Sequence, residues 1–163
     1  MNIMIRFTNT LDVLNDFGKF LVEEYKDNLI LNDAIASGSL YDSITYIIED
    51  RGKSIEVKLS LNEYAKYIEN GRKPGKFQPI SAIKRWIEIK PVLPRPMSNG
   101  KLPTNEQLAF LIARKIGLEG IKPRPILQKS IDDVFEVMRE FLEEALAKDI
   151  QEEFELILLS VRK

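Results

Sequence analysis

Cysteine and histidine are both absent from the 163 residues of this chain. Without cysteine, the chain has no thiol nucleophile, no disulfide and no thiolate ligand for a zinc ion. Without histidine, it has no imidazole base, no serine–histidine–aspartate triad and no histidine-ligated metal. Any catalysis would therefore depend on carboxylates, lysine, tyrosine or a hard cation.

Long hydrophobic runs are absent as well. No stretch approaches the roughly 20 apolar residues that span a bilayer, so we expect no membrane partner. The apolar start, Met1 to Ile5, is too short for a signal peptide, and no small-residue cleavage site follows it. We therefore expect a soluble, non-secreted protein.

The net charge of −1 conceals three blocks of opposite sign. Residues 1–71 have a net charge of −5, residues 72–129 of +10 and residues 130–163 of −6. One interpretation is that the blocks neutralise each other within one fold, or between copies packed head to tail in a ring. The other is that the basic block binds nucleic acid or a complementary protein surface.

The first part of the chain predicts a helix followed by a hairpin. Apolar residues recur at helical spacing over about 10–32, where Thr8 or Thr10 would cap the helix. Residues 43–49 and 54–60 are rich in β-branched and aromatic side chains and flank a glycine-containing turn, which predicts two antiparallel strands. Because two strands alone are marginally stable, the hairpin should pack on the N-terminal helix.

Short helices are expected in the middle of the chain, and a long one at its end. They are predicted over 62–70, between Pro79 and Pro91, and over 106–116, where Thr104 is the cap and Gly117 the stop. A proline-rich loop covers 91–104. From Ile126 a long helix begins, with an apolar stripe that includes Phe135 and Phe141 and an acidic outer face.

The predicted fold class is therefore α+β. A small antiparallel sheet, the hairpin at about 43–60, packs against long N- and C-terminal helices, with short helices in the middle. Residues 1–147 are expected to form a single domain with a helical and loop insertion at about 75–121. Residues 148–163 form an extension, either helix or strand. Its run Leu156–Leu159 is too apolar to stay exposed, so it should meet the core or another subunit.

Candidate chemistry is sparse. The carboxylates of the last helix lie on a solvated face with no pocket, and the chain has no calcium-binding or phosphate-binding loop. We therefore expect no enzymatic activity, no cofactor and no metal. In the basic block, Phe77, Trp86 and Phe110 could stack on bases. The helical spacing of Trp86 and Phe110 favours a packing role for these two.

Three short motifs follow one another along the chain. They are Ser37-Gly38-Ser39-Leu40-x-x-Ser43-Ile44, Tyr64-Ala65-x-Tyr67-Ile68-Glu69-Asn70-Gly71 and Lys122-Pro123-Arg124-Pro125-Ile126-Leu127-x-x-Ser130. In this order, between a long N-terminal helix and an acidic C-terminal helix, they make residues 10–147 resemble the tail-completion or head–tail joining proteins of tailed bacteriophages. The positions that carry the resemblance are Gly38, Leu40, Ser43, Tyr64, Ala65, Glu69, Gly71, Pro125 and Leu127.

The resemblance implies a structural virion protein rather than an enzyme. Such a protein forms a homo-oligomeric ring of six or twelve copies at the neck, where it joins or completes the tail at the head–tail connector. Its partners are the phage connector or adaptor and tail-tube proteins, with non-specific contact to genomic DNA in the lumen. It is found in the neck or tail of the virion, and in the host cytoplasm during assembly.

The exposed hairpin turn and the basic loops are the expected contact surfaces with neighbouring subunits or partners. The residues in question are Arg51, Lys53, Arg72, Lys73, Lys76, Phe77, Arg95, Lys101 and Arg124.

Three other functions compete with this one. The first is a sequence-independent nucleic-acid-binding module that uses the basic block 72–129. The second is an antitoxin-like or regulatory protein of mobile-element origin that forms a small fixed dimer. The third is an enzyme that uses a hard cation and the carboxylates of Glu63 and Glu69.

Overall fold

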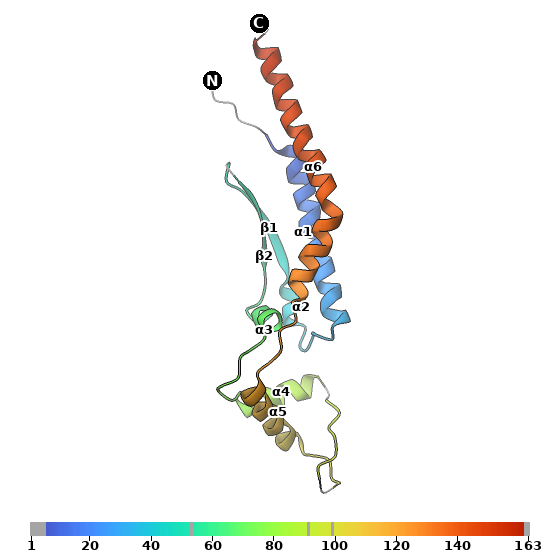
Figure 1. Ribbon diagram of the computed structural model, residues 1–163, viewed down its shortest axis with the longest axis vertical. Coiled ribbons are helices and arrows are strands. Elements are labelled where there is room, and N and C mark those ends of the chain that lie inside the picture. Colours follow the sequence, from blue (N-terminus) through green and yellow to red (C-terminus); the bar gives the residue numbers. More distant parts are fainter. Residues whose placement is uncertain (1–5, 53, 91, 99, 162–163) are drawn as a thin grey trace. The chain divides into compact units, whose positions relative to one another are not determined.

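The computed structural model describes residues 6–52, 54–90, 92–98 and 100–161 (Figure 1). It confirms the α+β fold, with a two-stranded antiparallel sheet and long N- and C-terminal helices. Over these residues the elements are α1 (Thr8–Leu31), α2 (Ser39–Ser43), β1 (Thr45–Asp50), β2 (Ile55–Ser60), α3 (Ala65–Asn70), α4 (Ile80–Ile89), α5 (Asn105–Glu119) and α6 (Ile126–Val161).

The chain divides into two compact units. The first, the hairpin unit, comprises residues 1–28, 44–60 and 127–163. The second, the middle unit, comprises residues 29–43 and 61–126.

In the hairpin unit, α1 and α6 lie side by side and run in opposite directions (Figure 1). Hydrogen bonds join the pair near both ends of α1. At one end Thr10 donates to Asp149, and at the other the Asn28 amide donates to the Ser130 hydroxyl over 3.0 Å. Buried apolar side chains fill the space between these polar contacts. They are Leu21, Tyr25, Val134, Met138 and Ala145.

The N-terminus of α1 is capped from α6. The helix begins at Thr8, so Thr10, one of the two predicted caps, lies inside its first turn. The buried carboxylate of Asp149 accepts hydrogen bonds from the backbone N–H groups of Asn9, at 2.9 Å, and Thr10, at 2.8 Å. It also accepts from the Asn9 amide at 2.7 Å and the Thr10 hydroxyl at 2.6 Å. A negative charge is favourable here because helix N-termini expose unpaired N–H groups.

The hairpin packs on α1, as predicted. Its register runs from the Thr45–Ser60 pair to the Asp50–Ile55 pair. The ring of Tyr46 fills the space that a Cβ at Gly18 would occupy, and its hydroxyl donates to Asn15 over 2.8 Å. The absence of a side chain at Gly18 is therefore what allows β1 to approach α1 closely.

In the middle unit, α4 packs against α5 (Figure 1). Thr104 caps α5 as predicted, in a reciprocal pair of bonds with Gln107. The predicted stop at Gly117 is wrong, because α5 continues to Glu119 and Gly120 follows it with φ +76°. Gly117 is needed inside the helix, where the ring of Phe77 occupies the place of its missing Cβ.

The C-terminal extension, predicted to be either helix or strand, is helical as far as Val161. Residues 162–163 lie outside the described residues. Within the described chain, no helix is both long and apolar enough to cross a membrane.

Candidate interaction surfaces

The second and third motifs are joined directly by backbone contacts in the middle unit. Arg72 and Ile121 exchange two hydrogen bonds of 2.8 Å, and the Arg124 N–H donates to the Ile68 carbonyl over 2.8 Å. Gly71 has φ +64°, and a Cβ there would overlap the Ile121 carbonyl oxygen. Glycine is required at this position, because only glycine readily adopts this backbone conformation and leaves room for the Ile121 carbonyl oxygen.

The first motif is tied to the same region. The Ser43 hydroxyl donates to the Leu40 carbonyl over 2.7 Å and accepts from the Asn62 N–H over 3.0 Å. Leu40, Ala65 and Ile68 are all buried. These motif residues therefore hold the middle unit together and do not form a contact surface.

The remaining motif residues are more accessible. Tyr64 and Pro125 are exposed, while Gly38, Glu69 and Leu127 are half-buried. The Tyr64 ring lies 6.2 Å from the ring of the neighbouring Tyr67, measured between centroids.

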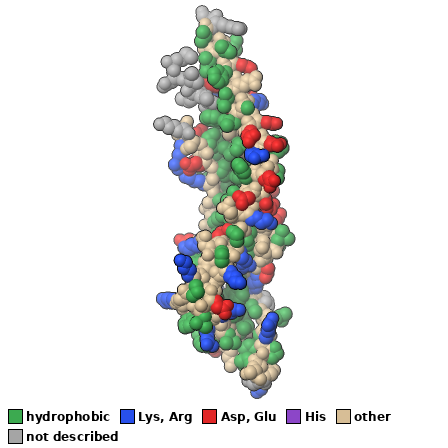
Figure 2. All heavy atoms as spheres, in the orientation of Figure 1, with side chains coloured by type: hydrophobic (Ala, Val, Ile, Leu, Met, Phe, Trp, Pro, Cys, Tyr) green, Lys and Arg blue, Asp and Glu red, His purple; other side chains and the backbone are tan. Residues whose placement is uncertain are grey.

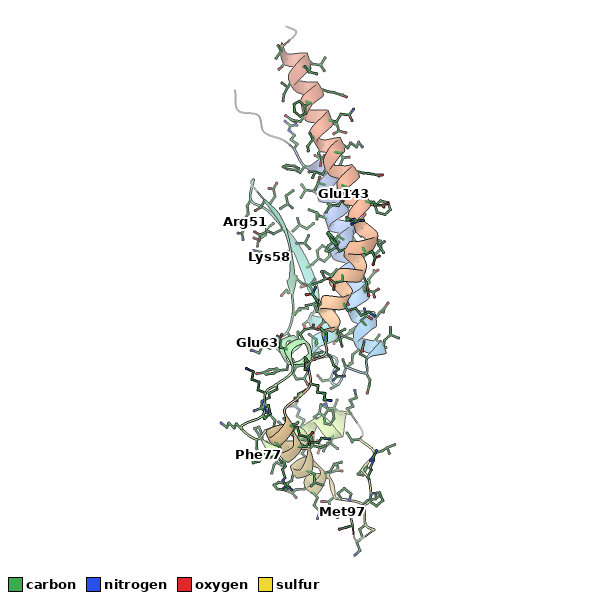
Figure 3. The ribbon with its side chains drawn as sticks, in the orientation of Figure 1. Arg51, Lys58, Glu63, Phe77, Met97 and Glu143 are labelled. Carbon is green, nitrogen blue, oxygen red and sulfur yellow. The ribbon has the colours of Figure 1, made fainter. Side chains whose placement is uncertain are left out.

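The basic turn after α3 is fastened to α5. The Arg72 guanidinium donates to the Lys76 carbonyl over 2.6 Å, and the Gly75 N–H donates to the Gly117 carbonyl over 2.8 Å. Phe77, labelled in Figure 3, lies against α5 yet remains 56% exposed. This half-exposed ring thus serves the packing of the middle unit as well as offering a surface.

Lys73 and Lys76 are the accessible charges of this turn. Both side chains are exposed, and among the described residues no ion pair engages either of them. They are therefore the cations of the predicted set best placed to meet an anionic partner.

The hairpin turn carries its own counter-ions. The Arg51 guanidinium lies 2.8 Å from the Glu49 carboxylate and 3.5 Å from that of Glu56, and the Lys58 ammonium lies 2.6 Å from Glu49 (Figure 3). Hydrogen bonds from Lys58 and Arg51 lower the pKa of Glu49, and the hydrogen bond to Glu49 raises the pKa of Lys58. The charge of Arg51 is thus largely balanced within the hairpin. Lys53 lies outside the described residues.

The other predicted contact residues are dispersed through the middle unit. Arg124 donates from its guanidinium to the Asn32 carbonyl over 3.1 Å, which gives it a structural role. Arg95 is exposed in the loop between α4 and α5, and the Lys101 carbonyl accepts from the Met97 N–H over 2.9 Å to close a turn. The predicted residues therefore form several separate surfaces.

The described part of the middle unit is hollowed at its surface. One hollow, of about 310 Å³, lies beside α2 and α4, and its lining includes Tyr41, Arg85 and Trp86. Another is an open, almost wholly apolar groove of about 370 Å³ at the junction of α4, α5 and their connecting loop. It is lined by Ile80, Met97, Glu106, Gln107, Phe110 and Leu111. No group of three acidic residues in the described chain is arranged to hold a metal ion.

Several side chains predicted to pack are exposed. Phe110 is 53% exposed, because it lines an open groove and is not enclosed between α4 and α5. On α6, Phe135 and Phe141 are 49% and 57% exposed, since α1 and the hairpin cover a narrower face than the apolar stripe.

The apolar end of α6 does not meet the core of the described chain. Leu156, Leu158 and Leu159 are 56–61% exposed, and Figure 2 shows hydrophobic side chains at the surface along this end of the helix. Of the two predicted environments, core or another subunit, the core is excluded for these three side chains.

Charge follows the division into units. The hairpin unit contains 11 basic and 18 acidic residues, a net charge of −7. The middle unit contains 13 basic and 7 acidic residues, a net charge of +6. The opposite charges of the sequence blocks therefore reside in separate parts of the fold.

Comparison of the chain with protein-family models, with curated proteins and with solved structures found no match.

Proposed function

We propose that this chain is a non-enzymatic structural protein of a tailed bacteriophage, which forms a ring at the neck and joins or completes the tail at the head–tail connector. The observation that carries the proposal is that backbone hydrogen bonds join the second and third motifs, while Ser43 of the first motif is bonded to Asn62, just before the second. Segments around Ser43, Gly71 and Arg124 are distant in sequence but contact one another in the middle unit. Several residues that carry the resemblance, among them Leu40, Ser43, Ala65 and Gly71, are thus constrained by the packing of this fold.

The surface supports assembly with other protein copies. Large apolar side chains are exposed on α5, on α6 and in the loop between α4 and α5, where a partner could cover them. The two units carry opposite net charges, which favours contacts between unlike surfaces of neighbouring copies. Contacts of this kind generate rings when the rotation between subunits closes.

The proposed partners follow from this assembly. A ring of six or twelve copies would contact the connector or adaptor proteins on one side and the tail tube on the other. DNA passing through the lumen would meet the basic middle unit without sequence specificity. The protein would be present in the host cytoplasm during assembly and in the neck of the finished virion.

Quantitative peptide mass spectrometry of gradient-purified particles tests the proposal. Particles of the phage that encodes this chain should contain it at a copy number comparable to that of the portal protein. Its absence from clean particles would overturn the proposal.

Nucleic-acid binding by the middle unit is the second candidate. The exposed ammonium groups of Lys73 and Lys76, which no ion pair engages among the described residues, favour it. A short duplex should then bind at low salt, with an affinity that falls steeply as salt rises. The double variant Lys73→Glu with Lys76→Glu should lose this binding, whereas Lys148→Glu on α6 should retain it. A wild-type protein that fails to bind at low salt would eliminate this candidate.

A further inference from the structure

The end of α6 extends beyond the contact with α1. Asp149 holds the first turn of α1, and twelve more helical residues follow it, a length of about 18 Å. Five apolar residues recur along this extension at the spacing of one helix face. They are Ile150, Phe154, Ile157, Leu158 and Val161.

This apolar stripe points away from the interior of the hairpin unit. At roughly 100° per residue, its centre lies on the side of α6 opposite to Ala145, which is buried in that interior. Phe154, Leu158 and Val161 are 60–71% exposed, whereas Ile150 and Ile157 are half-buried. Since a patch of this kind is costly to leave in water, it calls for a partner surface.

The groove in the middle unit has the complementary chemistry. Ile80, Phe110 and Leu111 are each 41–53% exposed along it, and its surface is almost entirely apolar although Glu106 and Gln107 also line it. Met97 contributes a flexible side chain from the loop (Figure 3). Such a groove suits the apolar face of an amphipathic helix.

Basic side chains lie beside the groove, which Glu106 also lines, and acidic side chains lie beside the stripe. Lys84 follows Ile80 by one turn of α4, and Arg114 follows Phe110 by one turn of α5. Neither cation has an ion pair within the described residues. The end of α6 carries Glu152, Glu153 and Glu155 between its apolar residues.

We propose that residues 150–161 of α6 in one copy dock in the α4–α5 groove of a second copy. The apolar stripe would cover Phe110 and Leu111, and Glu153 and Glu155 would face Lys84 and Arg114. The inference deepens the proposed function, since it assigns the contact between subunits of the ring. Because the two surfaces are different, the contact is head to tail and can be repeated from copy to copy.

Sedimentation velocity over a concentration series, at about 0.1 M salt, tests the contact. The full-length protein should associate, and Phe154→Glu and Phe110→Glu should each weaken the association by roughly tenfold or more. Val137→Glu is the matched control, because Val137 is 68% exposed on α6 but outside the stripe. It should associate like the wild type.

Mixing the two weakened variants distinguishes this contact from others. Phe154→Glu keeps an intact groove and Phe110→Glu keeps an intact α6 end, so the mixture should form a heterodimer that grows no further. The swap of Lys84→Glu with Glu153→Lys should restore association that either change alone weakens. Circular dichroism confirms that each variant is folded.

Three outcomes would overturn the inference. They are a wild-type protein that stays monomeric at all concentrations, a mixture that forms no heterodimer, and an association that Phe154→Glu leaves unchanged. The last would mean that the stripe is covered within its own chain or not at all. None of these outcomes removes the chain from phage particles, so a failure here is distinguishable from a failure of the proposed function.

Discussion

Asp149 holds the α1–α6 pair together, and its replacement by alanine should destabilise the protein substantially. The carboxylate accepts four hydrogen bonds, at 2.6–2.9 Å, from the backbone and side chains of Asn9 and Thr10. Asp149 is 1% exposed, so its loss would leave buried donors of α1 without an acceptor.

The expected cost follows from what the carboxylate supplies. A hydrogen bond to a charged group contributes about 1.5–3 kcal/mol, and loss of a helix cap costs about 0.5–2 kcal/mol. Because the four bonds share one carboxylate, these contributions are not additive. We expect Asp149→Ala to lower the free energy of unfolding by about 3 kcal/mol, and Asp149→Asn by about half of that. For a chain of this length, 3 kcal/mol corresponds to a decrease in Tm of about 6–12 °C.

The effect should depend on pH. Burial by itself raises the pKa of Asp149, but the hydrogen bonds from Thr10 and Asn9 outweigh it and hold the pKa below its ordinary value. The stabilisation by the ionised group is therefore complete above the unfolded pKa of about 3.9, and is lost as the pH falls through the lower folded pKa. The difference between wild type and Asp149→Asn should shrink below about pH 4.

Urea unfolding followed by circular dichroism, at neutral pH and near pH 3, measures both effects. Asp133→Asn is the control. Asp133 makes a long surface ion pair of 3.9 Å with Lys129, so this change should alter stability by less than about 1 kcal/mol. A free energy of unfolding for Asp149→Ala within about 0.5 kcal/mol of wild type would refute the reasoning. So would a difference between wild type and Asp149→Asn that does not vary with pH.

Three further contacts are tested by substitution, each with urea unfolding as the measurement. Gly117→Ala should cost about 1–3 kcal/mol because its Cβ would overlap the Phe77 ring. Phe77→Ala should reduce that cost in a double-mutant cycle, and strictly additive effects would contradict the contact. Gly71→Ala should cost about 3 kcal/mol, since it combines φ +64° with overlap of the Ile121 carbonyl. Gly52→Ala, at φ +73° in open space, should cost about 1 kcal/mol, and equal costs at the two glycines would count against the junction. Tyr46→Phe should cost about 1 kcal/mol through loss of the hydrogen bond to Asn15, and no change in stability would indicate that the bond contributes nothing.

Local patterns in the sequence predict most of the fold. Helical periodicity locates α1 and α6, and the capping box at Thr104 marks the start of α5 within a residue. What local patterns miss are contacts between distant segments. Gly117 has the features of a helix stop, but it lies within α5 because Phe77, forty residues earlier, packs on it. Asp149 caps a helix that begins 141 positions before it, and nothing near Asp149 signals this role.

The candidate surfaces were less predictable for a related reason. A basic residue in a loop is expected to be free, yet Arg72, Arg124 and Arg51 engage carbonyl or carboxylate groups of this chain. Folding brings these partners close to the arginines, and no local sequence pattern indicates which carbonyl or carboxylate each arginine will meet. In contrast, the α4–α5 groove includes no member of the predicted contact set, because it arises from the packing of two helices and a loop.

The location of the protein in the virion tests the central claim most directly. Particles assembled with a tagged copy of the chain can be labelled with gold and imaged by electron microscopy. The account predicts label at the junction of head and tail, in every particle that has a tail. Label at the tail tip or over the capsid, or particles that assemble complete and infectious without the chain, would contradict it.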